Sequence, residues 1–259
     1  MLDRVIEIAK QASALMNADN FEIEEKGSIE NIVTSSDLAV QRFVTERLSA
    51  LLPGSGFFCE EEDLQSYEEE YIWIIDPIDG TANYARHIDH CCISIALARY
   101  GVLQMGVVWS PWRNELYCAE RGKGAQLNGR PIHVSSRSFE QGLFCTAMST
   151  YRKEFAKTCS DIIYDIYMES NDTRRFGSAA IELCMMAAGY IELYFEMRLQ
   201  PWDYSAAMLI LTEAGGCILS HDGKAPSLHQ ASLVIAANSC SSAERMLETV
   251  RKHLPVLPY

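Results

Sequence analysis

The segment YIWIIDPIDGTANY, which begins at Tyr71, constrains the fold of this chain more than any other stretch. Residues 71–75 are aromatic or β-branched, a composition typical of a buried strand. Pro77 has no backbone N–H to continue a ladder of hydrogen bonds, so we expect the strand to end at Asp76. The strand therefore delivers two carboxylates, those of Asp76 and Asp79, into one tight turn where they repel each other.

The composition is that of an ordinary globular protein, with 259 residues of which 48% are hydrophobic and 22% are charged. No run of 18 apolar residues occurs, so we expect no membrane span. A net charge of −13 repels phosphate backbones, which argues against direct binding of nucleic acid. The nine cysteines form no C-x-x-C pair and their number is odd, so we expect free thiols and a cytoplasmic location.

The first part of the chain has the pattern of helices packed on an antiparallel sheet. Residues 1–16 have apolar side chains at helical spacing, which predicts an amphipathic helix rather than a signal peptide. A second helix is expected from about Asp37 to the Pro-Gly pair that follows it. Residues 92–134 then alternate between strands and turns, and the Asn-Gly pair at 128–129 predicts a hairpin.

Strands and helices alternate in the rest of the chain, as in an α/β layer. We expect strands at residues 142–148, 190–197 and 232–238, and helices at residues 151–170, 177–189 and 203–214, the last followed by two glycines. A capping box from Ser241 to Glu244 predicts the start of the last helix. We place a division near residue 138, which gives domains 1–138 and 139–259 with a cleft between them.

The two aspartates of the opening segment, taken alone, are most often turn and N-cap residues. Gly80 and Thr81 follow them and predict the start of a helix whose backbone N–H groups would bind an anion. Carboxylates and a bound anion repel each other, so they can lie side by side only if cations lie between them. Several oxygen ligands close together suit Mg²⁺. Glu60 upstream and Asp203 at a later helix start favour this second interpretation, although each alone would be a surface or capping residue.

Two long motifs resemble the signatures of a known family. WIIDPIDGTANY is similar to the first signature of the inositol monophosphatase family of Mg²⁺-dependent, Li⁺-sensitive phosphatases, and WDYSAAMLILTEAGG is similar to the second. The segment IVTSSD ending at Asp37, the glutamate pair at 60–61, GSAA from Gly177 and Glu196 extend the resemblance over nearly the whole chain. The resemblance implies an α+β or α/β fold, a layered sandwich of alternating α-β-α-β-α layers.

The resemblance also implies a set of metal ligands, which agrees with the chemistry expected from the residues. Glu60, Asp76 and the backbone carbonyl of Ile78 would hold one Mg²⁺ ion. Asp76, Asp79 and Asp203 would hold a second, and Glu60 would help to hold a weaker third. Two such ions would straddle the phosphate and neutralise the developing charge.

The catalytic groups that the resemblance implies lie next to these ligands in the sequence. The backbone amides of Gly80 and Thr81 would bind phosphate oxygens. The Thr81 hydroxyl, paired with Asp37, would activate a metal-bound water for in-line attack. Asp203 would protonate or orient the leaving oxygen through a water. Without the resemblance, Asp37 would be interpreted as a helix cap.

On the substrate side, the resemblance places the hydroxyls of a ring against Asp79, the backbone around Ser178 and Ala179, and Glu196, with Asp203 beside the leaving oxygen. Glu196 alone would be interpreted as a surface charge at the end of a strand. These positions imply a small phosphorylated alcohol as the substrate.

The match has departures from the family pattern. Cys59 replaces the glycine that precedes the glutamates, and a third glutamate follows them. Glu60 is therefore our first choice of ligand and Glu61 the second. Asp89 stands where the family usually has proline, and Thr146 lies in a substrate-proximal strand where members vary. The metal chemistry is unaffected, but the exact substrate stays open.

The function implied is a Mg²⁺-dependent phosphomonoesterase that converts inositol monophosphate to inositol and phosphate, acting as a homodimer. Fructose-1,6-bisphosphatase activity and hydrolysis of adenosine 3′,5′-bisphosphate are alternatives, because related families share the metal core. A role as the partner of another protein on the same fold is a third possibility, since some bacterial relatives are linked to transcription complexes. The complete set of acidic ligands argues against a purely non-catalytic scaffold.

Two further pairs of residues have open roles. His87 and His90 have the spacing of half a zinc site, but no cysteine or glutamate partner is placed convincingly, so we expect structural or surface roles. Arg174 and Arg175 can contact an anionic substrate or a partner protomer, and a surface ion pair is the expected default.

Overall fold

The structure is a computed structural model, which describes residues 1–16, 21–28, 31–61, 68–148, 150 and 152–257. Its α-helices are α1 (Leu2–Ala12), α2 (Ser35–Leu51), α3 (Thr81–Tyr84), α4 (Ala156–Glu169), α5 (Ala179–Ala187), α6 (Pro201–Glu213) and α7 (Cys240–His253). Short 3-10 turns are formed by Ser13–Leu15, Phe139–Gln141 and Lys153–Phe155. Among the described residues, no helix combines the length and the apolar character that are needed to cross a bilayer.

Within the described residues, the first large sheet has seven strands in the order β3-β4-β5-β6-β7-β8-β9. The strands are β3 (Gly56–Cys59), β4 (Tyr71–Asp79), β5 (Cys92–Arg99), β6 (Val102–Ser110), β7 (Glu115–Glu120), β8 (Ala125–Leu127) and β9 (Arg130–Ile132). Only β3 and β4 are parallel, and the other neighbours in this sheet are antiparallel. The predicted hairpin at 128–129 is confirmed, because Asn128 (φ 50°) and Gly129 (φ 75°) adopt the left-handed conformation that a tight β-turn of this kind requires.

The second large sheet, again within the described residues, has five strands in the order β11-β10-β12-β14-β13. The strands are β10 (Leu143–Thr146), β11 (Asp172–Arg174), β12 (Leu193–Leu199), β13 (Cys217–Leu219) and β14 (Ser232–Ala237). β10 is parallel to β11 and β12, whereas β14 is antiparallel to β12 and β13. A separate hairpin is formed by β1 (Ile23–Ser28) and β2 (Asn31–Thr34).

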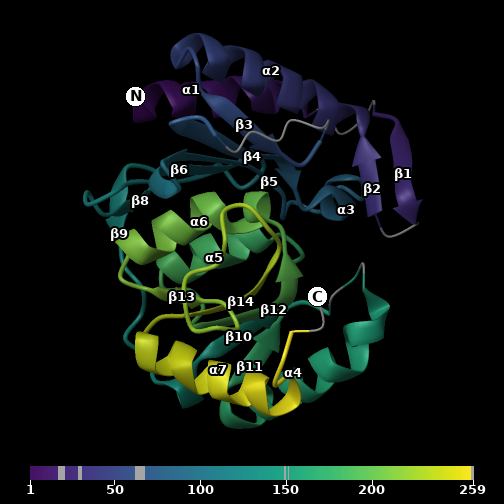
Figure 1. Ribbon diagram of the computed structural model, residues 1–259, viewed down its shortest axis with the longest axis vertical. Coiled ribbons are helices and arrows are strands. Elements are labelled where there is room, and N and C mark those ends of the chain that lie inside the picture. The colour runs from purple at the N-terminus through teal and green to yellow at the C-terminus, as the bar shows by residue number, and fades with distance from the viewer. Residues whose placement is uncertain (17–20, 29–30, 62–67, 149, 151, 258–259) are drawn as a thin grey trace.

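Layers of helices and sheets alternate through the molecule (Figure 1). Helices α1 and α2 cover the outer face of the seven-stranded sheet, and α5 and α6 lie between the two large sheets. Helices α4 and α7 cover the outer face of the five-stranded sheet. This arrangement is the α-β-α-β-α sandwich that the sequence resemblance implies, and the prediction of the fold class is confirmed.

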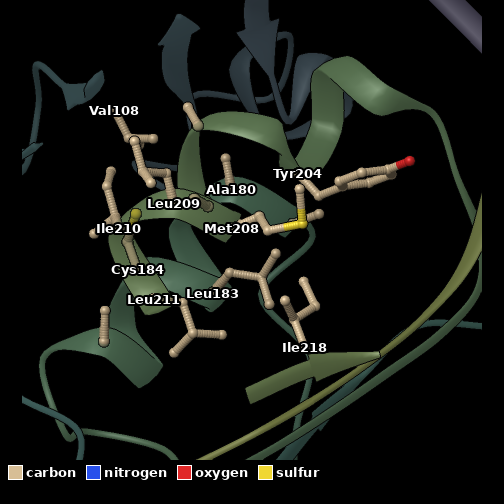
Figure 2. Close-up of a cluster of buried hydrophobic side chains, with 14 of the residues drawn as sticks. Val108, Ala180, Leu183, Cys184, Tyr204, Met208, Leu209, Ile210, Leu211 and Ile218 are labelled. Carbon is tan, nitrogen blue, oxygen red and sulfur yellow. The ribbon is translucent and has the colours of Figure 1, made fainter. Parts of the chain in front are cut away.

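The middle helices are buried because they are apolar on nearly every side, as expected for helices with a sheet on each face. Leu183 of α5, Leu211 of α6 and Ile218 of β13 lie in one buried cluster that also contains Val108 of β6 (Figure 2). Residues from both sides of position 138 share this cluster. The two halves are therefore joined by a common core, and their division into two domains near 138 stays a prediction.

The close approach of α6 to β6 depends on a glycine. A Cβ added to Gly106 would lie 2.5 Å from the carbonyl oxygen of Ala206, which is closer than a van der Waals contact. We expect Gly106→Ala to lower the free energy of unfolding by about 1–3 kcal/mol, the usual cost of overpacking a dense core. Urea denaturation measures this change, and an unaltered midpoint would mean that α6 moves away from the sheet at no cost.

The end of β4 differs from the sequence prediction. The strand continues through Pro77 to Asp79 instead of ending at Asp76, and its register with β5 shifts between these two aspartates. Proline is tolerated here because a β-bulge interrupts the ladder at the position where its missing N–H would otherwise be needed. The prediction that the strand ends at Asp76 was therefore wrong.

Several helix starts were also placed incorrectly. Helix α2 begins at Ser35 and α6 at Pro201, so Asp37 and Asp203 each occupy the third position of a helix instead of the cap. Helix α7 is capped by Ser239, whose side chain accepts the N–H of Ser242, and the capping box predicted from Ser241 to Glu244 is wrong. Short strands β1, β2, β3, β11 and β13 were not predicted, because each depends on a partner strand rather than on its own periodicity.

Candidate active site

Two carboxylates lie at the bulged end of β4. The side chains of Asp76 and Asp79 are buried, with 1% and 8% of their surface exposed. Gly80 follows them in the left-handed conformation (φ 89°) as the residue before α3. A Cβ at Gly80 would lie 2.8 Å from the carbonyl oxygen of His90, so the backbone at this turn approaches its neighbour too closely for any other residue. The turn thus needs glycine for its conformation and for space.

A third carboxylate reaches the same place from the other half of the chain. Asp203 is the third residue of α6, and its Oδ2 accepts the N–H of Gln200 at 2.7 Å, which fixes the side chain at the start of the helix. Within the described residues, Asp76, Asp79 and Asp203 each offer one carboxylate oxygen to a group in which all these oxygens lie within 4.8 Å of one another. The structure therefore brings together three of the predicted metal ligands.

The contacts that follow the end of β3 bear on whether Glu60 or Glu61 is the metal ligand. The N–H of Glu60 donates to the carbonyl oxygen of Ile75 on the neighbouring strand at 3.2 Å. The backbone of Glu61 is held by the buried Gln41, since its N–H donates to Oε1 of Gln41 at 3.0 Å and its carbonyl oxygen accepts from the Gln41 amide. The charge of Glu60 raises the pKa of Asp76 and of Asp203, which favours Glu60 as the ligand.

The electrostatics of the cluster follow from burial and like charge. Burial, followed by the charges of Glu60, Asp79 and Asp203, raises the pKa of Asp76 well above its usual range. Burial and the charges of Glu60 and Asp79 have the same effect on the pKa of Asp203. Burial raises the pKa of Asp79 to about 6, although hydrogen bonds from Ser178 and Ala180 oppose the shift.

A divalent cation would relieve this repulsion. The group of Asp76, Asp79 and Asp203 offers carboxylate oxygens, which are ligands that Mg²⁺ prefers. The residues present therefore fit the Mg²⁺ cofactor that the sequence resemblance implies.

The predicted pair of Thr81 and Asp37 is in contact. The Thr81 hydroxyl lies 3.3 Å from Asp37 Oδ1 and 3.0 Å from the carbonyl oxygen of Ile78. The other oxygen of Asp37 accepts the N–H of Thr34 at 2.8 Å and its hydroxyl at 2.5 Å, in a capping box at the start of α2. Asp37 is therefore both a capping residue and a neighbour of Thr81, so that neither interpretation from the sequence excludes the other.

The substrate side of the predicted site is built at the start of α5. Ser178 precedes this helix, and its hydroxyl donates to Asp79 Oδ2 at 2.5 Å. The N–H of Ala180 donates to the same oxygen at 2.8 Å. These two bonds connect the GSAA segment directly to the turn that carries the metal ligands, and they place Ala179 beside Asp79.

Glu196 lies on β12, in the five-stranded sheet. The hydroxyl of Tyr194 donates to Glu196 Oε2 at 2.7 Å. Burial raises the pKa of Glu196 to about 7, and the charge of Asp79 contributes to the increase. The contribution of Asp79 to the pKa of Glu196 indicates that the two carboxylates interact.

One buried acidic residue near the site, Glu182, was not predicted from the sequence. Glu182 of α5 is 2% exposed, and its Oε1 accepts the N–H of Phe176 at 2.6 Å and of Gly177 at 2.9 Å. Burial raises the pKa of Glu182 to about 8. The signal in the sequence was a single glutamate inside the apolar run AAIELCMMAA, where a charge needs a buried partner.

The open histidine and arginine pairs have structural partners. The His90 ring stacks on Phe176 with centroids 4.8 Å apart, and the ring of His87 lies 6.3 Å from that of Phe21, so the two imidazoles pack against different aromatic residues. Arg174 forms an ion pair with Asp172 at 2.5 Å, the surface role expected for it. 

Comparison with known proteins identifies the family. The model of the inositol monophosphatase family matches residues 2–254. The protein named Nus factor SuhB from Escherichia coli K12 is 34% identical over 230 residues, which cover 86% of each chain. Its counterpart in Vibrio cholerae is 33% identical over 260 residues, covering 98% of this chain and 96% of the relative.

Solved structures agree with the sequence relatives. The extragenic suppressor protein suhB of Bartonella henselae superposes with a TM-score of 0.88 at 28% identity, covering 97% of this chain and 98% of that one. The inositol monophosphatase of Anabaena superposes with a TM-score of 0.82 at 30% identity, covering 100% and 98%. With a family model that spans nearly its whole length and relatives that match it from end to end, this chain belongs to the inositol monophosphatase family.

Proposed function

We propose that this protein is a Mg²⁺-dependent phosphomonoesterase whose substrate is an inositol monophosphate. The observation that carries the proposal is the convergence of Asp76, Asp79 and Asp203, from two distant segments, beside the turn at Gly80 and Thr81. The names of the Anabaena and Thermotoga maritima relatives, which are inositol monophosphatases, support the choice of substrate.

In this proposal the metal ligands are Glu60, Asp76, the carbonyl oxygen of Ile78, Asp79 and Asp203. Two or three Mg²⁺ ions bound there would neutralise the phosphate and lower the pKa of the attacking water. The protein fixes the ligands before binding, because Asp79 is held by Ser178 and Ala180, and Asp203 by Gln200. Little rearrangement is then needed when the substrate arrives.

The residues around the ligands bind the phosphate and manage protons. The backbone N–H groups of Gly80 and Thr81 bind phosphate oxygens at the start of α3. The Thr81 hydroxyl accepts a proton from the nucleophile and passes its own to Asp37, whose Oδ1 lies 3.3 Å away. Asp203 protonates or orients the leaving oxygen through a water.

The leaving alcohol lies against the start of α5 and the end of β12. Its hydroxyls bind Asp79, the backbone around Ser178 and Ala179, and Glu196. Since burial raises the pKa of Glu196 to about 7, this carboxyl donates or accepts hydrogen bonds according to pH, which suits the hydroxyl groups of a polyol.

Phosphate release from a panel of substrates tests the proposed specificity. Inositol 1-phosphate, glycerol 2-phosphate, adenosine 2′-phosphate, fructose 1,6-bisphosphate and adenosine 3′,5′-bisphosphate are compared by kcat/KM at saturating Mg²⁺. We expect inositol 1-phosphate to give the highest value. A higher value for either bisphosphate would replace the proposed substrate and keep the phosphatase chemistry.

A bisphosphate is the second candidate because of one cation. The guanidinium of Arg175 is exposed, donates to the hydroxyl of Thr150 at 3.3 Å and lowers the pKa of Glu196. A second phosphate on the leaving group would find a positive charge there. Arg175→Gln should then reduce kcat/KM for the bisphosphates more than that for inositol 1-phosphate.

A protein-binding role is compatible with the same fold, since several relatives are named Nus factors. Pull-downs from cell extract with wild type and with an inactive Asp79→Asn variant separate the two roles. A partner that binds both equally would indicate a second role independent of catalysis. The homodimer and the cytoplasmic location stay predictions.

A further inference from the structure

Glu182 is a buried acid in a helix that is otherwise apolar. The neighbouring positions of α5 are alanine, isoleucine, leucine, cysteine and methionine, and most of them are fully buried. Glu182 itself is 2% exposed. A carboxyl group in such a position is stable only when its oxygens accept hydrogen bonds.

The acceptor role of Glu182 is specific. Its Oε1 accepts the N–H groups of two consecutive residues, Phe176 at 2.6 Å and Gly177 at 2.9 Å. Gly177 adopts φ +85°, a conformation that lets successive N–H groups point to one side of the chain. Glu182 therefore fixes the segment that enters α5.

The other side of this segment is held by the helix that follows the metal ligands. The side-chain amide of Asn83 in α3 donates to the carbonyl oxygen of Phe176 at 2.7 Å and to that of His90 at 2.8 Å. Glu182 and Asn83 thus hold the Phe176–Gly177 backbone from opposite directions. The residue that comes next, Ser178, donates to Asp79 Oδ2 at 2.5 Å.

We propose that Glu182 is a positioning residue for Mg²⁺ binding, which acts by holding the Phe176–Gly177 turn so that Ser178 and Ala180 fix the carboxylate of Asp79. With Ser178 and Ala180 both bound to Oδ2, the carboxylate is held in one rotation. A loose turn would let Asp79 rotate and weaken its ability to bind a cation. The proposal rests on the function proposed above in taking Asp79 as a Mg²⁺ ligand.

If Glu182 had a purely structural role, its replacement would lower the melting temperature without changing the Mg²⁺ affinity. Glu192 provides a matched control. Glu192 is 1% exposed and also accepts a backbone N–H, that of Leu143, at 2.8 Å. Its other partners are Ser135 and Arg137, which do not contact Asp79. Replacing either glutamate removes a buried carboxylate, but only Glu182 is connected to the metal ligands.

The test measures Mg²⁺ affinity by calorimetry, together with melting temperature and kcat and KM for inositol 1-phosphate. We expect Glu182→Leu to weaken Mg²⁺ binding by about 10–100-fold, the usual effect of losing a residue that orients a metal ligand, and excess Mg²⁺ to restore much of kcat. Glu182→Gln keeps the accepting oxygen and should bind Mg²⁺ within about threefold of wild type. Glu192→Leu should melt at a lower temperature with unchanged Mg²⁺ affinity.

Glu182→Asp keeps the buried acid but withdraws its oxygens from the turn, so it tests the proposal even if the leucine variant does not fold. We expect it to weaken Mg²⁺ binding in the same direction as Glu182→Leu. Wild-type Mg²⁺ affinity in a folded Asp or Leu variant, or an equal loss in Glu192→Leu, would overturn the proposal. Absence of Mg²⁺ binding and phosphate release in the wild type would instead refute the proposed function.

Discussion

Asp79→Asn should abolish phosphate release and yet raise the melting temperature of the protein in chelator. The charge of Asp79 contributes to the raised pKa of Asp76 and of Asp203, so the carboxylates repel one another without a cation. Removing one charge should stabilise the metal-free protein by about 1 kcal/mol, since a shift of one pKa unit is worth roughly that. Asparagine retains an oxygen that can accept from Ser178 or Ala180.

Saturating Mg²⁺ should reverse the order of the two proteins. Wild type gains about 2.7 kcal/mol when Mg²⁺ is at a hundredfold excess over its dissociation constant, and the variant gains less. Melting curves of both proteins, with chelator and with Mg²⁺, show whether the order changes. Asp222→Asn, a change in an exposed turn, is the control. It should have the melting temperature of wild type both in chelator and in Mg²⁺. Parallel shifts of Asp79→Asn and wild type would mean that Asp79 is only a turn residue.

The stability of the metal-free protein should also depend on pH through Asp79. Its folded pKa of about 6 lies above the ordinary value of 3.8, so the folded state binds the proton more tightly than the unfolded state. The resulting stabilisation is present below pH 3.8 and is lost as the pH rises through about 6. In chelator, the free energy of unfolding of wild type should therefore fall between pH 4 and pH 7 more steeply than that of Asp79→Asn, as urea titrations at several pH values would measure.

Thr81→Ala should bind Mg²⁺ and substrate nearly normally but lose about 10²–10⁴-fold in turnover, the usual range for a group that takes part in proton transfer. The reason is the contact of its hydroxyl with Asp37 at 3.3 Å. Asp37→Asn should show a similar defect, and the double variant should be little worse than either single one, because the pair acts as a unit.

Steady-state kinetics with inositol 1-phosphate measure these losses, and calorimetry measures Mg²⁺ affinity. Thr45→Ala is a suitable control, since the Thr45 hydroxyl only bonds the backbone of its own helix, at 2.9 Å to the carbonyl oxygen of Gln41. If Thr81→Ala keeps wild-type turnover, the hydroxyl serves only to hold the turn before α3 by donating to the carbonyl oxygen of Ile78.

The carboxylate cluster could be predicted from the sequence because its members lie in long, distinctive motifs. Asp76 and Asp79 lie at the end of a strand that is recognisable by its aromatic and β-branched residues, and Asp203 lies in the first turn of a helix that is apolar on nearly every side. Their convergence came from the family resemblance and not from the spacing. The structure confirms it, with ligand oxygens within 4.8 Å of one another among the described residues.

The parts that could not be predicted depend on tertiary partners. Pro77 continues β4 only because a bulge accommodates it, and Asp37 and Asp203 are third-position residues because Thr34 and Gln200 precede them as caps. The role of Glu182 was not predicted because it too depends on tertiary partners. Its partners are backbone N–H groups of a turn, and the sequence does not identify them, although a glutamate inside an apolar run indicates that buried partners exist.

The central claim, that the buried carboxylates form the metal site of a phosphatase, is tested most directly by phosphate release from inositol 1-phosphate after removal of metal with chelator. We expect no release without metal, recovery on addition of Mg²⁺, and inhibition of the recovered activity by Li⁺ and by excess Ca²⁺, which prefers longer bonds and more ligands than Mg²⁺. Full activity in chelator with no added metal would contradict it.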